Sequence, residues 1–213
     1  MKKGRVLLAM SGGVDSSTAA VLLTQQGYDV EGVTLKLWGG ETDSGCCSLA
    51  DVEDAKRVAA QLDITHHVFN LGDEFNRYVV EPYLKSHTEM LTPNPCIECN
   101  RHIKFAGLHD RAIAMGFDFV ATGHHARIAN DNGIYKLIRG VDDKKDQSYV
   151  LSMVNQTVLS QTLLPVGDLT KAQVREIAAQ AGLRTASKAE SMDVCFIEKK
   201  GREDFLSSRI QLH

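Results

Sequence analysis

The chain has 213 residues, of which 43% are hydrophobic and 24% charged, and its formal net charge is −3. This composition suits one or two soluble domains with a real core and excludes a surface that is basic throughout, so any nucleic-acid contact must be a local patch. Since no apolar run could span a bilayer and the one before Ser11 is too short for a secretory signal, we predict a cytoplasmic protein without a membrane partner. Its five cysteines indicate metal or redox ligands before disulfides.

Strand-like and helix-like segments alternate over the first 122 residues. Strands are predicted at 5–10, 30–37, 64–69 and 117–122, and helices at 15–26, 52–62, 73–90 and 100–115. Ser48 and Asp51 have the spacing of a capping box, and Pro82 should bend or break the helix at 73–90. This order predicts an α/β fold, with a parallel sheet sandwiched by helices.

The pattern changes after residue 122. Residues 126–138 form a hairpin pattern around Asp131-Asn132-Gly133, and a capped helix runs from Thr170 to about Gly182. Residues 184–213 show little periodicity. We predict a boundary near residue 165, between a first domain (1–165) and a small helical extension (166–213) that carries Cys195.

The stretch AMSGGVDSS, which starts at Ala9, has the layout of a phosphate-binding loop between a strand and a helix. Gly12 and Gly13 let backbone amides approach an anion, serines add hydroxyl donors, and the helix N-terminus adds partial positive charge. The loop lacks the lysine of a Walker loop, so it suits a pyrophosphate better than a γ-phosphate about to be transferred. Asp15 would orient the loop or a magnesium ion; the alternative is a simple Gly-Ser turn with Asp15 as a helix N-cap.

A second motif is the C-x-x-C of Cys96 and Cys99, in LTPNPCIECNRHIKF. Both thiols should lie near a helix N-terminus, where the dipole, with Arg101 and Lys104 nearby, favours the thiolate form. A third cysteine, Cys195, lies in AESMDVCFIEK. The alternative interpretation is half of a structural zinc site, completed by Cys195 and a histidine.

Seven ordered blocks resemble the bacterial tRNA-specific 2-thiouridylases, a family of PP-loop ATP pyrophosphatases. They are AMSGGVDSS, GCCSLADVEDAKRVA, TPNPCIECNRHIKF, ATGHHAR, GVDDKKDQSYVL, LPVGDLTKAQVREIA and ESMDVCFIE. The resemblance implies an adenine nucleotide α-hydrolase-like PP-loop domain that uses ATP and Mg²⁺. It implies 2-thiolation of the wobble uridine in tRNAs for Lys, Glu and Gln, through an adenylated C2 oxygen and release of AMP. The sulfur would come from a donor protein or sulfide, and the family continues beyond the length of this chain into β-rich domains that grip tRNA.

The resemblance also implies roles for individual residues. Those expected to bind ATP are Ala9, Met10, Ser11, Gly12, Gly13, Val14, Asp15, Ser16, Leu35 (on the adenine) and Gly123. Those expected to contact the target base or the tRNA are Asn94, Pro95, Cys96, His124, Lys145, Asp146 and Gln147. Cys99, Cys195 and Asp15 would be catalytic. Plainer interpretations remain open: Leu35 as core, His124 and His125 as ordinary loop residues, and Lys144 and Lys145 as a solvated turn.

Cys96 departs from the simplest family pattern, in which an aspartate stands there and the counterparts of Cys99 and Cys195 act as a persulfide relay. Related thiolases with three such cysteines hold a [4Fe–4S] cluster, so we favour a cluster on Cys96, Cys99 and Cys195 over the relay. Without the cluster, Cys99 would pair with Cys195 or Cys96 in a disulfide. The adjacent Cys46 and Cys47 are interpreted as structural.

Two other functions remain open on the sequence. One is a PP-loop enzyme that adenylates a small-molecule carbonyl, and the other is a non-catalytic nucleotide-binding remnant. The basic segments at 101–111 and 136–145 flank the cysteines and favour tRNA over a small molecule. The intact loop and the three cysteines argue against a remnant.

Overall fold

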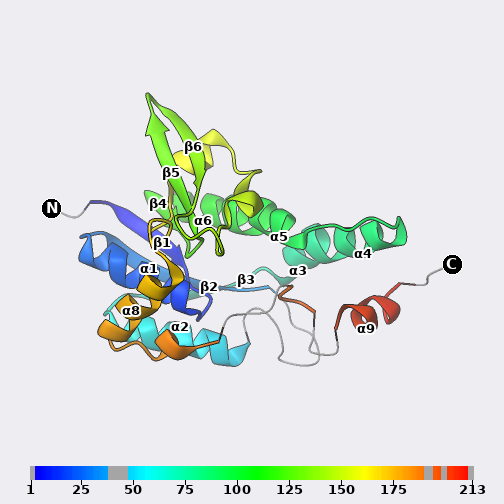
Figure 1. The fold of residues 1–213 in the computed structure, drawn as a ribbon, viewed down its shortest axis with the longest axis horizontal. Helices are drawn as coiled ribbons and strands as arrows, with labels where there is room; N and C mark the ends of the chain where they lie inside the picture. Colours follow the sequence, from blue (N-terminus) through cyan, green and yellow to red (C-terminus); the bar gives the residue numbers. More distant parts are fainter. Residues whose placement is uncertain (1–2, 38–47, 190–193, 198–200, 211–213) are drawn as a thin grey trace.

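The computed structural model describes residues 3–37, 48–189, 194–197 and 201–210. Its centre is a five-stranded sheet in the order β3-β2-β1-β4-β7 (Figure 1). The strands are β1 (Arg5–Ala9), β2 (Asp29–Lys36), β3 (His66–Asn70), β4 (Phe119–Ala121) and β7 (Thr162–Leu163). Each strand runs parallel to its neighbours, which confirms the predicted α/β fold. The predicted structural role of Cys46 and Cys47 lies outside the described residues.

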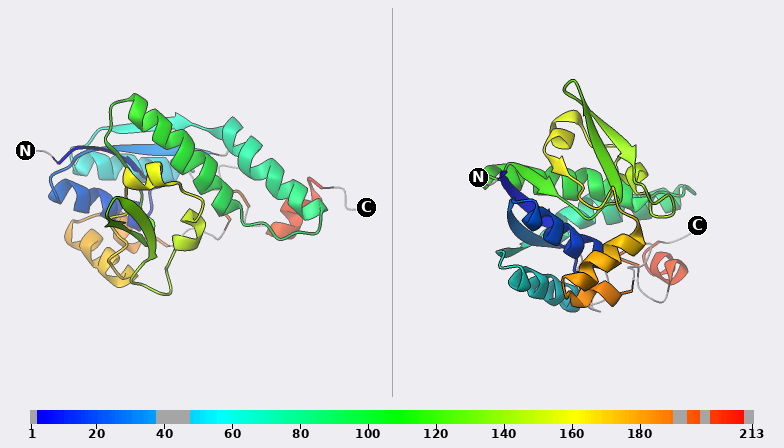
Figure 2. Two further views of the ribbon diagram at one scale, coloured as in Figure 1. Left: turned by 90° about the horizontal axis from the view of Figure 1, so that it is seen from above. Right: turned by 60° about the vertical axis from the view of Figure 1, so that its left-hand side comes forward.

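Helices cover both faces of this sheet, because successive side chains of a strand point to opposite sides. Leu7 of β1 lies in one buried cluster, and Val6 and Leu8 lie in another. Two helical runs, at residues 72–88 and 95–114, cover the Leu7 face and pack side by side (Figure 2). The opposite face is covered by α1 (Val14–Gln25), α2 (Leu49–Gln61) and α8 (Lys171–Gln180).

The first helical run consists of α3 (Gly72–Phe75), the π-helical segment η1 (Asn76–Val80) and α4 (Glu81–Thr88). The sequence predicted a bend or break near Pro82, but the helical run continues through it. Pro82 stands in the first turn of α4, where a missing N–H is tolerated. The change to π geometry just before this proline is the only irregularity between residues 72 and 88.

The second helical run consists of α5 (Pro95–Glu98), the π-helical segment η2 (Cys99–Gly107) and α6 (Leu108–Ala114). It begins at Pro95 rather than near residue 100, because the Asn94 side chain caps it. The Asn94 carboxamide oxygen accepts a hydrogen bond from the backbone N–H of Cys96 at 3.0 Å. Both thiols of the C-x-x-C therefore lie within a helical run, at its first turn.

Two predicted capping boxes are confirmed. At α2 the Ser48 hydroxyl accepts the N–H of Asp51, whose carboxylate accepts the N–H of Ser48. Thr170 and Gln173 make the same exchange at the start of α8. Each box fixes the entry angle of a helix that packs beside the first strand's loop.

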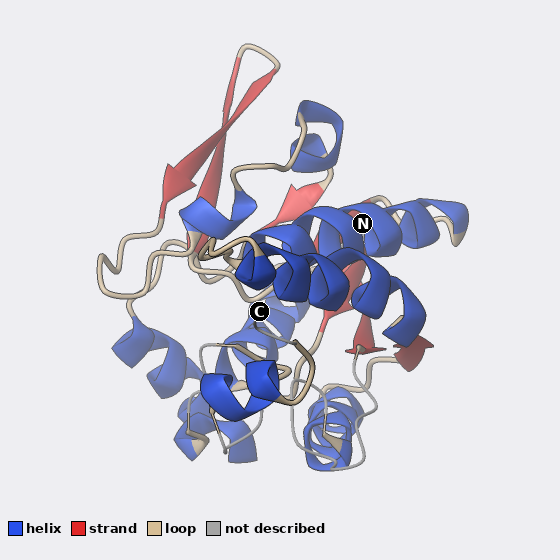
Figure 3. Cartoon of the chain, turned by 90° about the vertical axis from the view of Figure 1, so that its right-hand side faces the viewer, coloured by secondary structure: helices blue, strands red, loops and turns tan. Residues whose placement is uncertain are grey.

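The predicted hairpin is also confirmed, as β5 (Ala126–Asp131) paired with β6 (Ile134–Arg139). It projects away from the sheet and helices (Figure 3). Beyond it lie η3 (Ser148–Leu151), α7 (Gln156–Ser160), η4 (Arg184–Ser187) and α9 (Arg202–Ser207). The sequence did not predict these short elements, because a single turn shows no period.

The helix α8 follows the predicted boundary at residue 165 and packs against α1. Its Val174 and Ala178 are fully buried in the same cluster as Ala19 and Ala20 of α1. Residues on both sides of the boundary thus share one core, and the boundary itself stays a prediction. Within the described ranges, no helix is both long and apolar enough to cross a membrane.

Candidate functional site

The candidate site lies where the strand order reverses. From β1 the chain moves outward to β2 and β3, and then returns to the other side of β1 for β4. In such sheets ligands bind at the carboxyl ends of the two strands that flank this switch point. Here those ends lead into two loops, residues 10–13 after β1 and residues 122–125 after β4.

The first loop is shaped by Gly12 and braced by its own serines. Gly12 has φ +71°, and a Cβ there would lie 2.3 Å from the carbonyl oxygen of Asp51, so no larger residue fits. The hydroxyls of Ser16 and Ser17 donate to the Gly13 carbonyl at 3.2 and 2.8 Å. No described side chain caps α1, so the amides of its first turn suit an anion.

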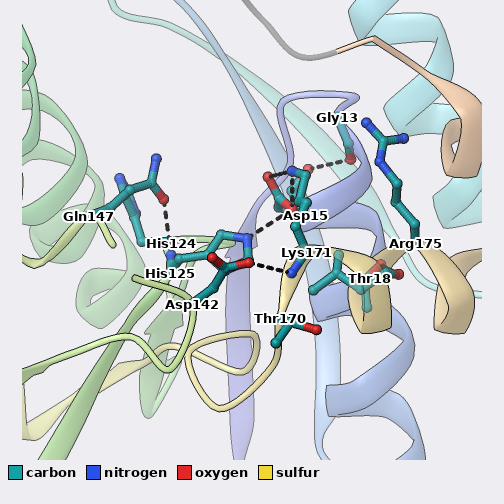
Figure 4. Close-up of polar contacts among 12 residues, drawn as sticks. Gly13, Asp15, Thr18, His124, His125, Asp142, Gln147, Thr170, Lys171 and Arg175 are labelled. Carbon is teal, nitrogen blue, oxygen red and sulfur yellow. Dashed lines mark hydrogen bonds and ion pairs between the residues drawn. The ribbon is translucent and has the colours of Figure 1, made fainter. Parts of the chain in front are cut away.

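Asp15, at the start of α1, is held by two cations (Figure 4). The Lys171 ammonium donates to both carboxylate oxygens at 2.7 Å, and His125 Nε2 lies 3.2 Å from one of them. Burial by itself would raise the pKa of Asp15, but the hydrogen bonds from His125 and Lys171 outweigh it and lower the pKa below its ordinary value. Asp15 is therefore an ionised carboxylate beside the loop.

The cations that the loop sequence lacks come from far along the chain. Lys171 is the first residue of α8, and its backbone N–H donates to the Asp142 carboxylate at 2.9 Å. Lys188 Nζ donates to the Gly12 carbonyl at 3.0 Å and to Asp51 and Asp54 at 2.7 Å each. The sequence analysis missed both lysines, because neither has a local signal that relates it to the loop.

The second loop packs closely on the first turn of α1. A Cβ on Gly123 would lie only 2.6 Å from the backbone nitrogen of Ser16. His124, expected near the tRNA, is buried, with its Nδ1 2.7 Å from the Thr122 hydroxyl. Burial, reinforced by the charge of Lys104, holds the pKa of His124 well below its ordinary value, so its imidazole is neutral.

The segment expected to contact tRNA, residues 145–147, is tied to this loop. The Gln147 side-chain oxygen accepts the His125 N–H at 3.0 Å, and the Gln147 N–H donates to the His125 carbonyl at 2.9 Å. The Asp146 carboxylate accepts from the Gly140 N–H and from the N–H and hydroxyl of Ser148. Asp146 and Gln147 thus carry structural hydrogen bonds, and their contact with tRNA stays a prediction.

Several cations of the two basic segments are paired with acidic neighbours. Arg101 lies 3.4 Å from Glu98, and Arg139 lies 3.4 Å from Asp146. Arg111 and Lys136 are paired in the same way. Exposed pairs of this kind contribute only about 0–1 kcal/mol, so a phosphate can displace the acidic partner.

The three described cysteines divide between two parts of the core. Cys99 is buried in the Leu7 cluster, and Cys195 packs against that cluster. Cys96 packs instead against a separate cluster of Phe105, Ala126, Val150, Leu151 and Val158. All three carry thiols.

This division does not suit a metal site. No group of three or more His, Cys, Asp or Glu side chains in the described part of the chain lies close enough to hold a metal ion. The arrangement therefore supports neither the zinc alternative nor the cluster that we favoured. It does place Cys99 and Cys195 against one core cluster.

The remaining predicted residues have other structural partners. Leu35 lies in the Leu7 cluster and is 6% exposed, as its plainer interpretation as core requires. Asn94 caps α5, and Pro95 occupies the first helical position. A cavity of about 310 Å³ lies beside them, lined by Val79, Pro82, Tyr83, Ser86, Pro93, Asn94, Pro95, Ile97 and Glu98. Neither thiol of the C-x-x-C lines it, so this cavity is not a place where the cysteines could meet a base.

Solved structures with a similar fold include two nucleotide-dependent enzymes. The U34-tRNA thiolase NcsA from Methanococcus maripaludis, with its [4Fe-4S] cluster, matches with a TM-score of 0.55 and 17% identity, over 86% of this chain and 58% of that one. NMN synthetase from Francisella tularensis matches with a TM-score of 0.50 and 19% identity, over 99% and 79%. At these identities the likeness shows the fold alone.

Sequence relatives are much closer. The chain is 52% identical over 210 residues to the tRNA-specific 2-thiouridylase MnmA of Moorella thermoacetica, covering 95% of this chain and 59% of that protein. It is 50% identical over 217 residues to the MnmA of Heliobacterium modesticaldum, covering 99% and 56%. The chain thus spans less than two thirds of the length of these curated relatives.

A family model agrees with these relatives. Residues 4–199 match the model described as the tRNA methyl transferase HUP domain. This match and the two identities near 50% confirm the resemblance seen in the seven sequence blocks. The chain therefore belongs to the tRNA methyl transferase HUP domain family and is a relative of the tRNA-specific 2-thiouridylases.

Proposed function

We propose that this chain uses ATP to adenylate the C2 oxygen of the wobble uridine of tRNA and then exchanges that oxygen for sulfur. The observation that carries the proposal is the phosphate loop at the switch point, which has no lysine of its own and has Lys171 and Lys188 beside it. Such a loop suits a departing pyrophosphate. The names of the curated relatives support tRNA as the substrate, in the lysine, glutamate and glutamine tRNAs.

ATP would bind with its phosphates on the backbone amides of residues 9–16. Gly123 would line the nucleotide, and Leu35 would lie toward the adenine. Mg²⁺ needs only one or two protein carboxylates when a nucleotide supplies further oxygens, and the ionised Asp15 fits that requirement. Bound there, Mg²⁺ would neutralise phosphate charge, while Lys171 would keep Asp15 oriented.

The bond changes follow from the weakness of the uracil C2 carbonyl as an electrophile. The C2 oxygen attacks the α-phosphorus of ATP, and the bond to pyrophosphate breaks. A sulfur nucleophile then attacks C2, and AMP leaves with the former carbonyl oxygen. Cysteine sulfur is a suitable nucleophile at neutral pH, and the base must leave its stack to reach it.

Cys99 and Cys195 would deliver the sulfur, since both belong to the Leu7 face of the core. One thiol receives sulfur as a persulfide from a donor protein or from sulfide with an oxidant, and its terminal sulfur attacks C2. The other thiolate then breaks the S–S bond and forms a Cys99–Cys195 disulfide, which an external dithiol reduces. This relay replaces the cluster as our preferred chemistry, because Cys96 packs elsewhere.

A Cys96→Asp variant tests that choice. We expect thiolation with a persulfide donor to continue in this variant, and to stop in Cys99→Ser and Cys195→Ser. The anaerobically purified wild-type protein should contain no stoichiometric iron. Iron and activity that both disappear in Cys96→Asp would restore the [4Fe–4S] cluster and reject the relay.

The reaction itself is tested by its products. With tRNA, ATP and a persulfide donor, we expect AMP, pyrophosphate and a wobble nucleoside in which sulfur replaces oxygen by mass spectrometry. Asp15→Ala should abolish turnover. ADP and phosphate as products would reject the PP-loop assignment, and a methylated nucleoside would favour the activity named by the family description. AMP formed with a small carbonyl compound but not with tRNA would favour the small-molecule alternative.

A further inference from the structure

The Lys188 side chain connects three parts of the molecule. Its ammonium contacts the Gly12 carbonyl of the phosphate loop and the Asp51 and Asp54 carboxylates of α2. The lysine side chain is 29% exposed and each aspartate 23%, so the contacts are partly shielded from water. Burial alone would lower the pKa of Lys188, but the two carboxylates raise it, which keeps the ammonium charged.

The backbone around Lys188 is held from the opposite side. The Arg175 guanidinium of α8 donates to the carbonyls of Ala186 and Lys188, at 2.6 and 3.1 Å. Charge-assisted hydrogen bonds of this kind are about twice as strong as neutral ones. Residues 186–188 are therefore fixed between α8, α2 and the phosphate loop.

The same stretch of chain reaches the cysteine pair. Cys195 follows Lys188 by seven positions and packs against the cluster that contains Cys99. Its neighbour Phe196 is 1% exposed and meets Phe75 and Tyr83 edge to face, with centroids 5.7 and 5.3 Å apart. One chain segment thus has an ionic anchor at the phosphate loop and an aromatic anchor beside the sulfur chemistry.

We propose that Lys188 is a positioning residue that ties the Cys195 segment to the phosphate loop, so that nucleotide binding and the presentation of Cys195 depend on each other. Phosphates on the loop add negative charge beside the ammonium and hold it in place, so the segment opens less often. Binding linkage is reciprocal, so a held segment also favours the nucleotide. The purpose of this tie rests on the proposed sulfur transfer, but the tie itself does not.

The test measures how fast iodoacetamide alkylates Cys195, by peptide mass spectrometry of the whole chain, with Cys99 as the internal reference. Without nucleotide, we expect Lys188→Met to speed Cys195 alkylation about tenfold, the effect of losing a charge-assisted anchor. Lys188→Arg should restore most of the protection. Lys56→Met is the matched control, because Lys56 is an exposed lysine of the same helix, α2, and its loss changes the net charge equally.

A second measurement adds Mg²⁺ and an ATP analogue that cannot be cleaved between the α- and β-phosphates. In the wild-type protein we expect Cys195 alkylation to slow about fivefold, and in Lys188→Met the nucleotide should have no effect. Asp54→Asn, which removes one partner of Lys188 from the surface of α2, should give an intermediate rate. This variant keeps the test decisive if Lys188→Met fails to fold.

The outcomes separate the two proposals. Unchanged Cys195 alkylation in both Lys188→Met and Asp54→Asn, or equal acceleration in Lys56→Met, overturns the tie. A wild-type rate that ignores bound nucleotide overturns the coupling. If the analogue does not bind, the proposed function fails, while the nucleotide-free rates still decide whether Lys188 holds the Cys195 segment.

Discussion

Gly123→Ala should separate the two loops of the candidate site with a single methyl group. The added Cβ would lie 2.6 Å from the backbone nitrogen of Ser16, 2.7 Å from the carbonyl carbon of Asp15 and 3.0 Å from the Asp15 Cβ. All three distances are shorter than the 3.4 Å at which ordinary contact begins. Two of the three atoms belong to the backbone of α1, so no side-chain rotation can relieve the overlap.

The size of the effect follows from this geometry. Overpacking of a rigid site costs about 1–3 kcal/mol, and for a chain of this length each kcal/mol lowers Tm by about 2–4 °C. We therefore expect Tm to fall by about 2–12 °C. Moving the second loop also draws His125 away from Asp15, which it contacts at 3.2 Å. A misplacement of this kind at a catalytic group can slow turnover about 100-fold.

The assay is thermal unfolding followed by circular dichroism, together with ATP binding by calorimetry. Gly72→Ala is the matched control. A Cβ there would meet nothing closer than the Asn70 side-chain oxygen at 3.4 Å, so its effect on stability should stay within about 0.5 kcal/mol. If Gly123→Ala keeps both the wild-type Tm and the wild-type ATP affinity, the close approach of the two loops has no energetic role and our account of the site is wrong.

Other predictions concern charge. Lys171→Met should lower kcat/KM for ATP about 100-fold while Lys171→Arg retains part of it, since a preorganised cation beside the phosphates is lost; a wild-type rate in Lys171→Met would remove this lysine from the site. The free energy of unfolding should fall by about 1 kcal/mol between pH 7 and 5.5, because the unfolded His124 takes up a proton that its buried, depressed-pKa form does not. His124→Gln should flatten that slope in denaturant titrations, and an unchanged slope would contradict the assignment. Neutral substitutions of Lys144 and Lys145 should reduce the salt dependence of tRNA binding by about one counterion per lost phosphate contact, and binding indifferent to salt would argue against a tRNA partner.

Local signals predicted the parts of the fold that depend on near neighbours. The Ser48 and Thr170 boxes, the hairpin and the four main strands all follow from spacing within a few residues. The start of the second helical run was also readable, because Asn94 followed by Pro95 is a good cap with a proline at the first helical position. That signal was read as extended chain, so the helix was placed too late.

The parts that sequence reasoning missed depend on distant contacts. Lys171 meets Asp15, and Lys188 meets Gly12, only because α8 packs on α1. The two-residue strand β7 is too short to show a period. The division of the cysteines was missed for a similar reason, since the spacing of Cys96 and Cys99 does not reveal that two separate hydrophobic clusters flank their helix.

The distance along the chain between the phosphate loop and its lysines has a consequence during synthesis. The loop leaves the ribosome early, whereas Lys171 and Lys188 emerge more than 150 residues later. Until then Asp15 has neither its ammonium partner nor the packing of α8 against α1. A nascent chain should therefore ignore cellular ATP until almost the whole of this sequence is available, so translation itself delays the first nucleotide-bound state.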